Sequence, residues 1–158
     1  MYLKVGERMK NSTFALNTQL TDCAVLVMRI HGCLDGATYT QLIDEAQSLY
    51  NKNHRQLILD LTHLRALSLA GLFGLHSMAA IFNGDEPLAP EGGWHALRAM
   101  KHDLDSGPQP QIKLSSPPPQ IQQVLSQTGF DSFFDVYHDV GTAVASFKTE
   151  ANSPTIMP

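Results

Sequence analysis

The sequence predicts an α/β fold, with a mixed or mostly parallel sheet of four to five strands and about four helices packed mainly on one face. Two apolar, strand-like segments, "CAVLVMRIHG" and "QLILDL", support the sheet. Apolar residues at helical spacing follow each of them, and strands and helices alternate again near the C-terminus. This alternation predicts parallel strands joined by helices, in a chain long enough for one core.

The first half of the chain begins with a weak alternation at 13–18, which indicates an edge strand. The apolar, β-branched run that follows predicts a central strand ending at Gly32. The next segment predicts a helix, for which Asp35 or Thr38 is a candidate cap. Its apolar residues share one face of that helix: Tyr39, Leu42, Ile43, Ala46, Leu49 and Tyr50.

The segment Gln56–Met78 carries most of the information. Residues 56–61 predict a second buried strand, followed by a short turn and a helix entered through Ala70 and Gly71. This helix runs to about residue 82 with apolar residues on one side: Leu72, Leu75, Met78, Ala79 and Phe82.

Residues 83–110 differ in composition and are interpreted as an insert. The first part is rich in glycine, proline and acidic residues, and 94–104 predict a short helix. One interpretation is a mobile surface loop with a partly ordered helix. The other is a partner-binding surface anchored by Trp94, because a lone tryptophan often forms an interface hot spot.

After the insert, the sequence predicts a strand, a helix, a last strand and a last helix. Residues 111–116 form the strand, and prolines at 117–119 begin the helix, where a missing N–H costs least. Gly129 is the expected C-terminal cap of that helix. The last strand is "FFDVY", and the last helix follows at 139–151.

The net charge, the lengths of the apolar runs and the N-terminal residues argue against a nucleic-acid partner, a membrane partner and secretion. The net charge of −4 gives no basic footprint, so we expect no nucleic-acid partner. No apolar run reaches the roughly 18 residues of a membrane span, so we expect no membrane partner. The first ten residues contain Glu7 and no apolar core, which is unlike a signal peptide. We therefore expect a cytoplasmic protein.

The reactive residues show no catalytic or metal-binding pattern. Cys23 and Cys33 flank the first long strand, about 30 Å apart, which predicts free thiols. No two of the seven histidines are four residues apart, as in a helical metal site. Asp35 and Asp60 could be paired carboxylates for acid–base catalysis, but no nucleophile or base accompanies either of them in the sequence. We expect no enzyme activity, no cofactor and no metal.

Three quoted segments resemble a STAS domain of the anti-sigma factor antagonist type. They are "HGCLDGATYTQLIDEAQSLY", "LILDLTHLRALSLAGLFGL" and "IKLSSPPPQIQQVLSQTGFDSFFDVYHDVGTAVASF". The matching residues are Gly32, Leu34, Asp35, Asp60, Leu61, Gly71, Leu72, Gly129, Phe130, and Phe133 or Phe134. The resemblance implies an extension at 1–12, a domain at 13–148 with the insert, and a flexible tail at 149–158.

In that family, the unphosphorylated domain binds an anti-sigma factor that is also a serine kinase, and a sigma factor is released. The kinase then phosphorylates the serine directly before the glycine that opens the second helix. A phosphate adds about 1.5 to 2 negative charges at a helix N-terminus and so changes the docking surface. The resemblance therefore implies a non-enzymatic module that regulates transcription by partner switching.

This chain departs from the family pattern at that serine. The usual Asp-Ser-Ser becomes Ser68-Leu69-Ala70, and Ala70 has no hydroxyl, so we expect no phosphorylation at residue 70. Ser68 is a displaced phosphosite, a polar contact to a partner or, as we favour, a turn or N-cap hydroxyl. Leu69 is either buried in the turn or exposed to a partner. We expect Gly71 to permit close helix–strand approach.

The expected docking surface joins the turn before the second helix to the loop after the first long strand. Its candidate residues, with the insert anchor, are His31, Gly32, Asp35, Ser68, Leu69, Ala70, Gly71, Leu72 and Trp94. The expected partner is an anti-sigma factor of the serine-kinase type or another STAS protein, and a homodimer is a further option. The alternative is a scaffold or ligand-sensing subunit that self-associates, with a pocket between the insert and the sheet edge.

Overall fold

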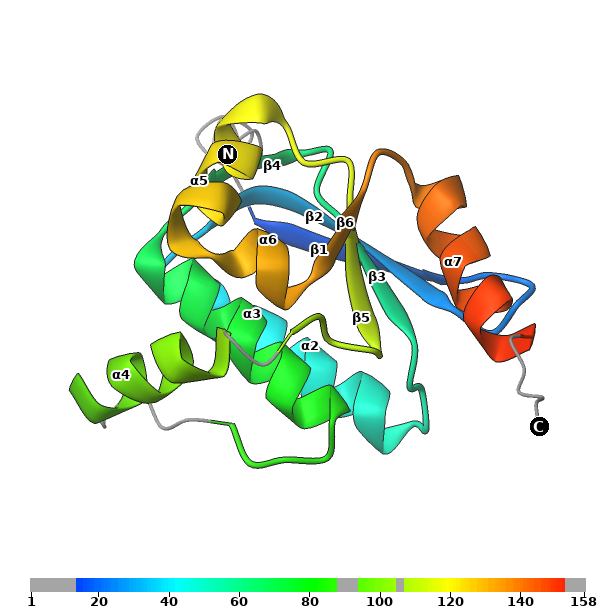
Figure 1. Cartoon of the computed structure of the whole chain (residues 1–158), viewed down its shortest axis with the longest axis horizontal. Helices are drawn as coiled ribbons and strands as arrows, with labels where there is room; N and C mark the ends of the chain where they lie inside the picture. The colour runs from blue at the N-terminus through cyan, green and yellow to red at the C-terminus, as the bar shows by residue number, and fades with distance from the viewer. Residues whose placement is uncertain (1–13, 88–93, 105–106, 153–158) are drawn as a thin grey trace, which may run out of the picture.

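The computed structural model describes residues 14–87, 94–104 and 107–152, and the expected extension at 1–12 lies outside them. Six strands and six helices alternate within these ranges, so the predicted α/β class is confirmed (Figure 1). The last helix continues to residue 152, whereas the tail was expected from 149; the end of the tail, 153–158, lies outside the description.

The strands form one mixed sheet in the order β1-β2-β3-β5-β6, and β4 pairs with β2 outside this path. β1 is antiparallel to β2, and the other pairs are parallel. Both β3 and β5 are buried throughout, as expected for central parallel strands covered on two faces. The strands are β1 Ala15–Leu20, β2 Leu26–Leu34, β3 Leu57–Asp60, β4 Leu64–Leu67, β5 Ile112–Ser115 and β6 Asp135–Tyr137.

The helices are divided unequally between the two faces of the sheet. A large core joins one face to α2, α3, α5 and α6, and a small core joins the other face to α7 alone. Figure 1 shows α2 and α3 on the side opposite to α7. This agrees with helices packed mainly on one face. The helices are α2 Tyr39–Asn51, α3 Leu69–Phe82, α4 Trp94–Asp103, α5 Pro119–Thr128, α6 Phe130–Phe133 and α7 Val140–Asn152.

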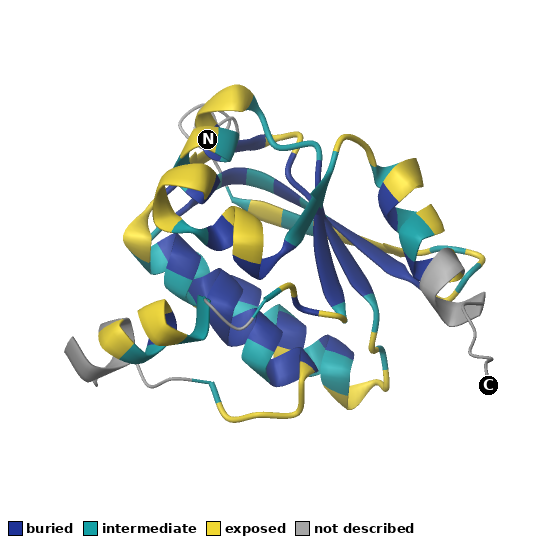
Figure 2. Cartoon of the chain, in the orientation of Figure 1, coloured by how far each residue is buried: buried dark blue, intermediate teal, exposed yellow. Residues whose placement is uncertain are grey.

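The apolar stripes predicted for α2 and α3 face the core. Leu42, Ala46 and Leu49 of α2 are buried, and all five predicted residues of α3 are buried as well. Figure 2 shows α3 buried along most of its length. A helix that is buried on nearly every side must be apolar all round, which explains why the α3 sequence contains so few polar residues.

β2 is longer than predicted, and β4 was not predicted at all. The sequence suggested that β2 ends at Gly32, but the strand continues to Leu34. Gly32 has a φ of +96°, and directly after it the pairing with β4 skips Arg65, so β2 passes an irregularity at the glycine and does not end there. The extended part of β2 pairs with Leu64–Leu67, which was interpreted as a turn. Because β4 has only four residues, it is a strand only by virtue of its pairing with β2.

The boundaries of α5 agree with the sequence prediction, whereas the last strand begins later than predicted. Pro119 begins α5, and Gly129 caps it in the left-handed conformation with a φ of +86°, as predicted. The last strand is shorter than predicted because Phe130–Phe133 form one helical turn, α6, before β6. The Phe133 and Phe134 rings pack edge to face, with centroids 4.9 Å apart, and are buried in the core.

The short helix predicted in the insert is confirmed as α4. Met100 of α4 is buried and joins the large core. On α3, the buried His76 places Nε2 3.0 Å from the Asp103 Oδ2 atom of α4. Trp94 begins α4, but its side chain lies outside the description. The described part of the insert is therefore packed on α3.

His76 is the most perturbed titratable group at this contact. Burial lowers the pKa of His76, and the hydrogen bond and negative charge of Asp103 oppose that shift only in part. The ring also stacks on Phe133, with centroids 5.5 Å apart. The folded protein therefore favours the neutral imidazole, which donates its Nε2–H to Asp103.

We expect His76 to reduce the free energy of unfolding as the pH falls below about 6.5, the ordinary histidine pKa. The unfolded chain binds the proton there, whereas the folded chain binds it only at lower pH, so protons favour unfolding within that window. Below the folded pKa both states are protonated and the loss levels off.

Urea unfolding at about pH 5 and about pH 7 measures this effect. His76→Asn should reduce the difference between the two pH values. His102→Asn is the control, because that side chain is 90% exposed, and it should leave the difference unchanged. An unchanged difference in His76→Asn would contradict the assignment.

Candidate docking surface

The turn between β4 and α3 is held by two hydrogen bonds of Ser68. Its Oγ accepts from the Gly71 N–H, with a donor–acceptor distance of 3.3 Å, while its backbone is extended. The structure therefore confirms Ser68 as an N-cap residue. Its own N–H donates to the Leu34 carbonyl oxygen at 3.1 Å. The start of α3 is thus tied directly to the end of β2.

Gly71 lies against the end of β2, as predicted for a close helix–strand approach. A Cβ atom at this position would overlap the Leu34 carbonyl oxygen and lie 2.9 Å from Leu67 Cδ1. Neither the backbone oxygen nor the packed leucine has room to move. The next residue, Leu72, is buried in the core. Gly71, which has no side chain, and the buried Leu72 therefore position the turn without forming its surface.

Leu69 is exposed, which answers the question that the sequence left open. Its relative exposure is 58%, and Leu20 on β1, at 55%, is the other large apolar side chain so exposed among the described residues. Ser68 before it is exposed, and Ala70 after it is half-buried. An exposed leucine at the start of a rigid helix is a ready apolar contact for a partner.

The His31–Asp35 segment lies beside the turn because the end of β2 pairs with β4. Leu34 pairs with Leu67, the last residue before the turn. Gly32 is buried and lies where the register of the β2–β4 pairing shifts, so it shapes this segment without presenting a side chain. The Asp35 Oδ1 atom accepts from the Ala37 N–H at 3.0 Å. Asp35 thus orders the loop before α2.

Sequence reasoning missed His63, which stacks on His31 with ring centroids 4.8 Å apart. The Gly32 N–H donates to the His63 carbonyl oxygen at 3.2 Å. This bond holds His63 next to His31, the residue before Gly32. The segment "DLTHLRAL" contains this histidine, but the β2–β4 pairing that places it had not been predicted. His63 is exposed and extends the surface from the turn toward His31.

The start of α2 and the end of β3 are organised by local hydrogen bonds. Thr38 is the N-cap residue of α2, but neither its side chain nor that of Asp35 accepts from an N–H of the helix, because the Asp35 carboxylate bonds to Ala37 in the loop. At the end of β3, Asp60 Oδ2 lies 3.4 Å from Arg29 Nε, and Asp60 Oδ1 accepts from the Thr62 hydroxyl at 2.6 Å. Both carboxylates thus have structural partners.

Other candidate chemistry is not assembled in the part of the chain described. Within these ranges no three histidine, cysteine, aspartate or glutamate side chains are grouped to hold a metal ion. Cys23 and Cys33 are both free. None of the described helices has the length and apolar character to cross a membrane.

The fold is that of solved anti-sigma factor antagonists. An antagonist from Mycobacterium paratuberculosis superposes with a TM-score of 0.62 and 17% identity, covering 87% of this chain and 96% of that one. A putative antagonist from Thermotoga maritima gives a TM-score of 0.63 and 14% identity, covering 84% and 94%. No protein-family model and no curated protein matches the sequence. The likeness confirms the predicted STAS fold.

Gly71→Ala should lower the free energy of unfolding by about 1–3 kcal/mol, because the added methyl group overlaps the backbone of Leu34. This loss is the net value, after the gain of about 1 kcal/mol that alanine brings to a helix has been subtracted. Gly36→Ala is the control, since a Cβ there meets nothing within 4 Å. Urea unfolding compares the two variants, and an equal effect of both would contradict the close approach.

Ser68→Ala should lower the free energy of unfolding by about 1 kcal/mol through loss of the cap. Ser68→Asp should retain most of the stability, because a carboxylate also accepts from helical N–H groups and favours the helix N-terminus. Thermal and urea unfolding measure both variants. If Ser68→Asp loses as much stability as Ser68→Ala, the cap is not the stabilising contact.

Proposed function

We propose that this protein acts as an anti-sigma factor antagonist, a binding module that docks a partner through the turn Ser68–Leu72 and the adjacent His31–Asp35 segment. The observation that carries the proposal is the exposed Leu69 at the rigid start of α3. The fold shared with two antagonists supports the class of protein. The module regulates transcription by partner switching and needs no catalytic residue.

The geometry of the turn favours tight docking. Burying an exposed leucine side chain contributes about 1.5–3 kcal/mol. Ser68 fixes the turn at both its N–H and its Oγ, so little backbone freedom is lost when a partner binds. His31 and His63 stack at the other end of β4 from the turn and would add a polar margin to a partner that also covers β4.

The proposed module lacks the usual phosphate switch. Ala70 has no side-chain hydroxyl for a kinase, and the Ser68 Oγ atom already accepts from the Gly71 N–H. The protein would therefore behave as a permanently unphosphorylated form. Its control would come from its expression level, from a competing partner or from a complex with other STAS proteins.

The partner we propose is an anti-sigma factor of the serine-kinase type in the cytoplasm. Such a partner would recognise the start of α3 whether or not residue 70 carries a hydroxyl, because Leu69 and the capped turn provide the contact. Another STAS protein, or a second copy of this chain, would be a partner with a different consequence, namely assembly into a scaffold.

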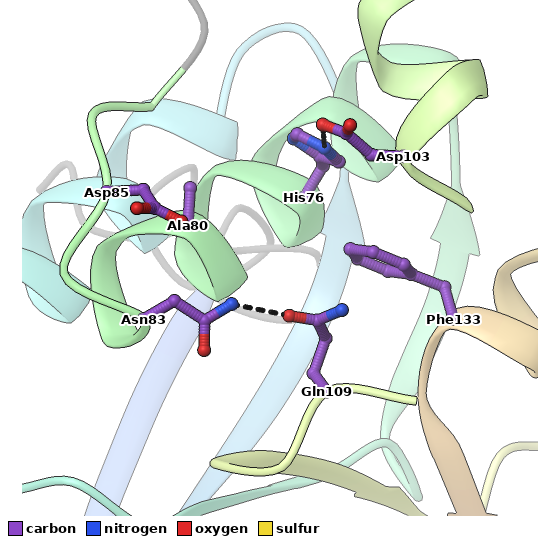
Figure 3. A pocket seen from close by; sticks show the side chains of 7 residues that line it. All are labelled: His76, Ala80, Asn83, Asp85, Asp103, Gln109 and Phe133. Atoms are coloured by element: carbon purple, nitrogen blue, oxygen red, sulfur yellow. Dashed lines mark hydrogen bonds and ion pairs between the residues drawn. The ribbon is translucent and has the colours of Figure 1, made fainter. Parts of the chain in front are cut away.

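A second candidate function is a ligand-sensing subunit, favoured by a cavity of about 190 Å³ beside the insert. The sequence suggested a pocket between the insert and the sheet edge. This cavity lies against α3 instead, and residues of α4 and α6 also line it (Figure 3). The insert packs on α3 through His76 and Met100, which explains the difference.

Leu69→Glu should weaken partner binding by about tenfold or more, because a buried apolar contact is replaced by a charge. The melting temperature should not change, since Leu69 is exposed. Leu20→Glu is the matched control, because Leu20 is exposed to a similar degree on β1, at 55%. Partners are captured from native cytosol with the wild-type protein and with each of the two variants, and the amount of captured partner is compared.

Recovery of a kinase-type anti-sigma factor that Leu69→Glu loses and Leu20→Glu keeps supports the proposal. Equal loss in both variants would mean that the turn is not the docking surface. Recovery of only this chain or other STAS proteins would favour the second candidate function.

A further inference from the structure

β1 lies at one end of the sheet and pairs with β2 alone among the described strands (Figure 1). Proteins usually protect such an edge by keeping the strand short, or by placing charged residues, prolines or bulges on it. β6, at the opposite end of the sheet, has only three residues and begins with Asp135. β1 has six residues, "ALNTQL", without a charge or a proline, and its register with β2 is unbroken. Of the two end strands, β1 is therefore the one that lacks the usual protection.

The hydrogen bonds between β1 and β2 show which backbone groups of β1 face outward. The Thr21 N–H donates to the Val25 carbonyl oxygen at 2.9 Å, so these residues form a hydrogen-bonded pair at the end of the ladder. In an antiparallel ladder such pairs recur at every second residue, and the residues between them direct their N–H and C=O groups away from the partner strand. On β1 the residues between them are Leu16, Thr18 and Leu20. Their backbone groups therefore form the outer edge of the sheet.

The same three residues share the face of the sheet that carries the large core. Leu16 pairs with Ile30 and Leu20 pairs with Leu26, and both partners belong to that core. Helices do not cover the end of β1, because Leu20 is 55% exposed and Thr18 is exposed as well. The outer edge thus combines backbone groups that β2 does not use with an apolar side chain that the core does not cover.

We propose that the outer edge of β1 binds the outer edge of β1 in a second copy of this chain, as an antiparallel pair about a twofold axis at Thr18. This axis places Thr18 opposite Thr18 of the partner subunit and Leu20 opposite the partner subunit's Leu16. All three outward-facing residues then form hydrogen-bonded pairs together. Each exposed Leu20 gains a leucine beside it, and a Thr–Thr pair is favourable between strands.

The edge is self-complementary in charge as well as in hydrogen bonding. β1 carries no charged residue, so two copies of it meet without like charges opposite each other. Pairing about a twofold axis uses the same surface on both subunits, so association stops at the dimer. Six residues per strand make a small interface, which corresponds to a reversible dimer with a Kd of about 10–100 µM.

The inference goes beyond the proposed function, because β1 is not part of the docking surface. Leu20→Glu should weaken self-association and retain the docked partner, whereas Leu69→Glu should do the reverse. Self-association is measured on the purified chain, and docking is measured by partner capture. Either proposal can therefore fail without the other.

Sedimentation equilibrium of the full chain, from about 10 µM to about 1 mM, tests the proposal. We expect a monomer–dimer equilibrium for the wild type. Thr18→Lys and Thr18→Glu should each raise the Kd by about tenfold, because like charges then face each other across the axis. An equimolar mixture of these two variants should associate again, because a lysine then faces a glutamate. Gln127→Lys and Gln127→Glu, at an exposed position of α5, are the matched controls and should leave the Kd unchanged, alone or mixed.

Amide hydrogen exchange of the wild type gives a second measurement that needs no variant. Raising the protein concentration should slow exchange at Leu16, Thr18 and Leu20, whose N–H groups face outward. It should not change exchange at Asn17 and Gln19, whose N–H groups face β2.

Three results would overturn the proposal. The first is a monomer at every concentration up to about 1 mM, which would show that a second copy does not occupy this edge. The second is self-association that both Thr18 variants retain, which would place the contact on another surface. The third is a loss in both Thr18 variants that their mixture does not restore, which would show that the two copies of Thr18 do not face each other.

Discussion

The contact of α3 with the end of β2 is the constraint on which the candidate docking surface depends. The Leu34 carbonyl oxygen accepts from the Ser68 N–H and lies where a side chain at Gly71 would otherwise be. This contact depends on β2 continuing past the register shift at Gly32. It fixes the direction in which α3 leaves the sheet. As a result, Leu72 enters the core and Leu69 remains exposed.

The same helix connects the docking turn with the cavity beside the insert. Its first turn carries Leu69, and its C-terminal half carries His76 and the residues that line the cavity. α3 is buried on nearly every side, so it is a rigid element between the two sites. The insert adds α4 to this helix by means of Met100 in the core and the His76–Asp103 contact. The α4 segment thus packs on α3 and contributes Asp103 to the cavity beside that helix.

Elements with a long, regular pattern were predictable, whereas short elements that depend on a neighbour were not. The stripes of α2 and α3 and the caps at Ser68 and Gly129 follow from local sequence, because helical spacing and capping preferences act over a few residues. β4 has only four residues and becomes a strand by pairing with the extended end of β2. For the same reason the stack of His31 on His63 could not be anticipated.

Residue 70 has no hydroxyl, a glycine follows it, and strands alternate with helices around this turn; all three facts can be read from the amino-acid sequence. These are properties of residue type and spacing. The outward position of Leu69, the burial of Leu72 and the contact of His76 with Asp103 of α4 arise only in the folded chain. Exposure and contact depend on chain segments distant in sequence, and packing of those segments sets them. The absence of a hydroxyl at residue 70 was therefore readable at once, whereas the exposure of the residues around it was not.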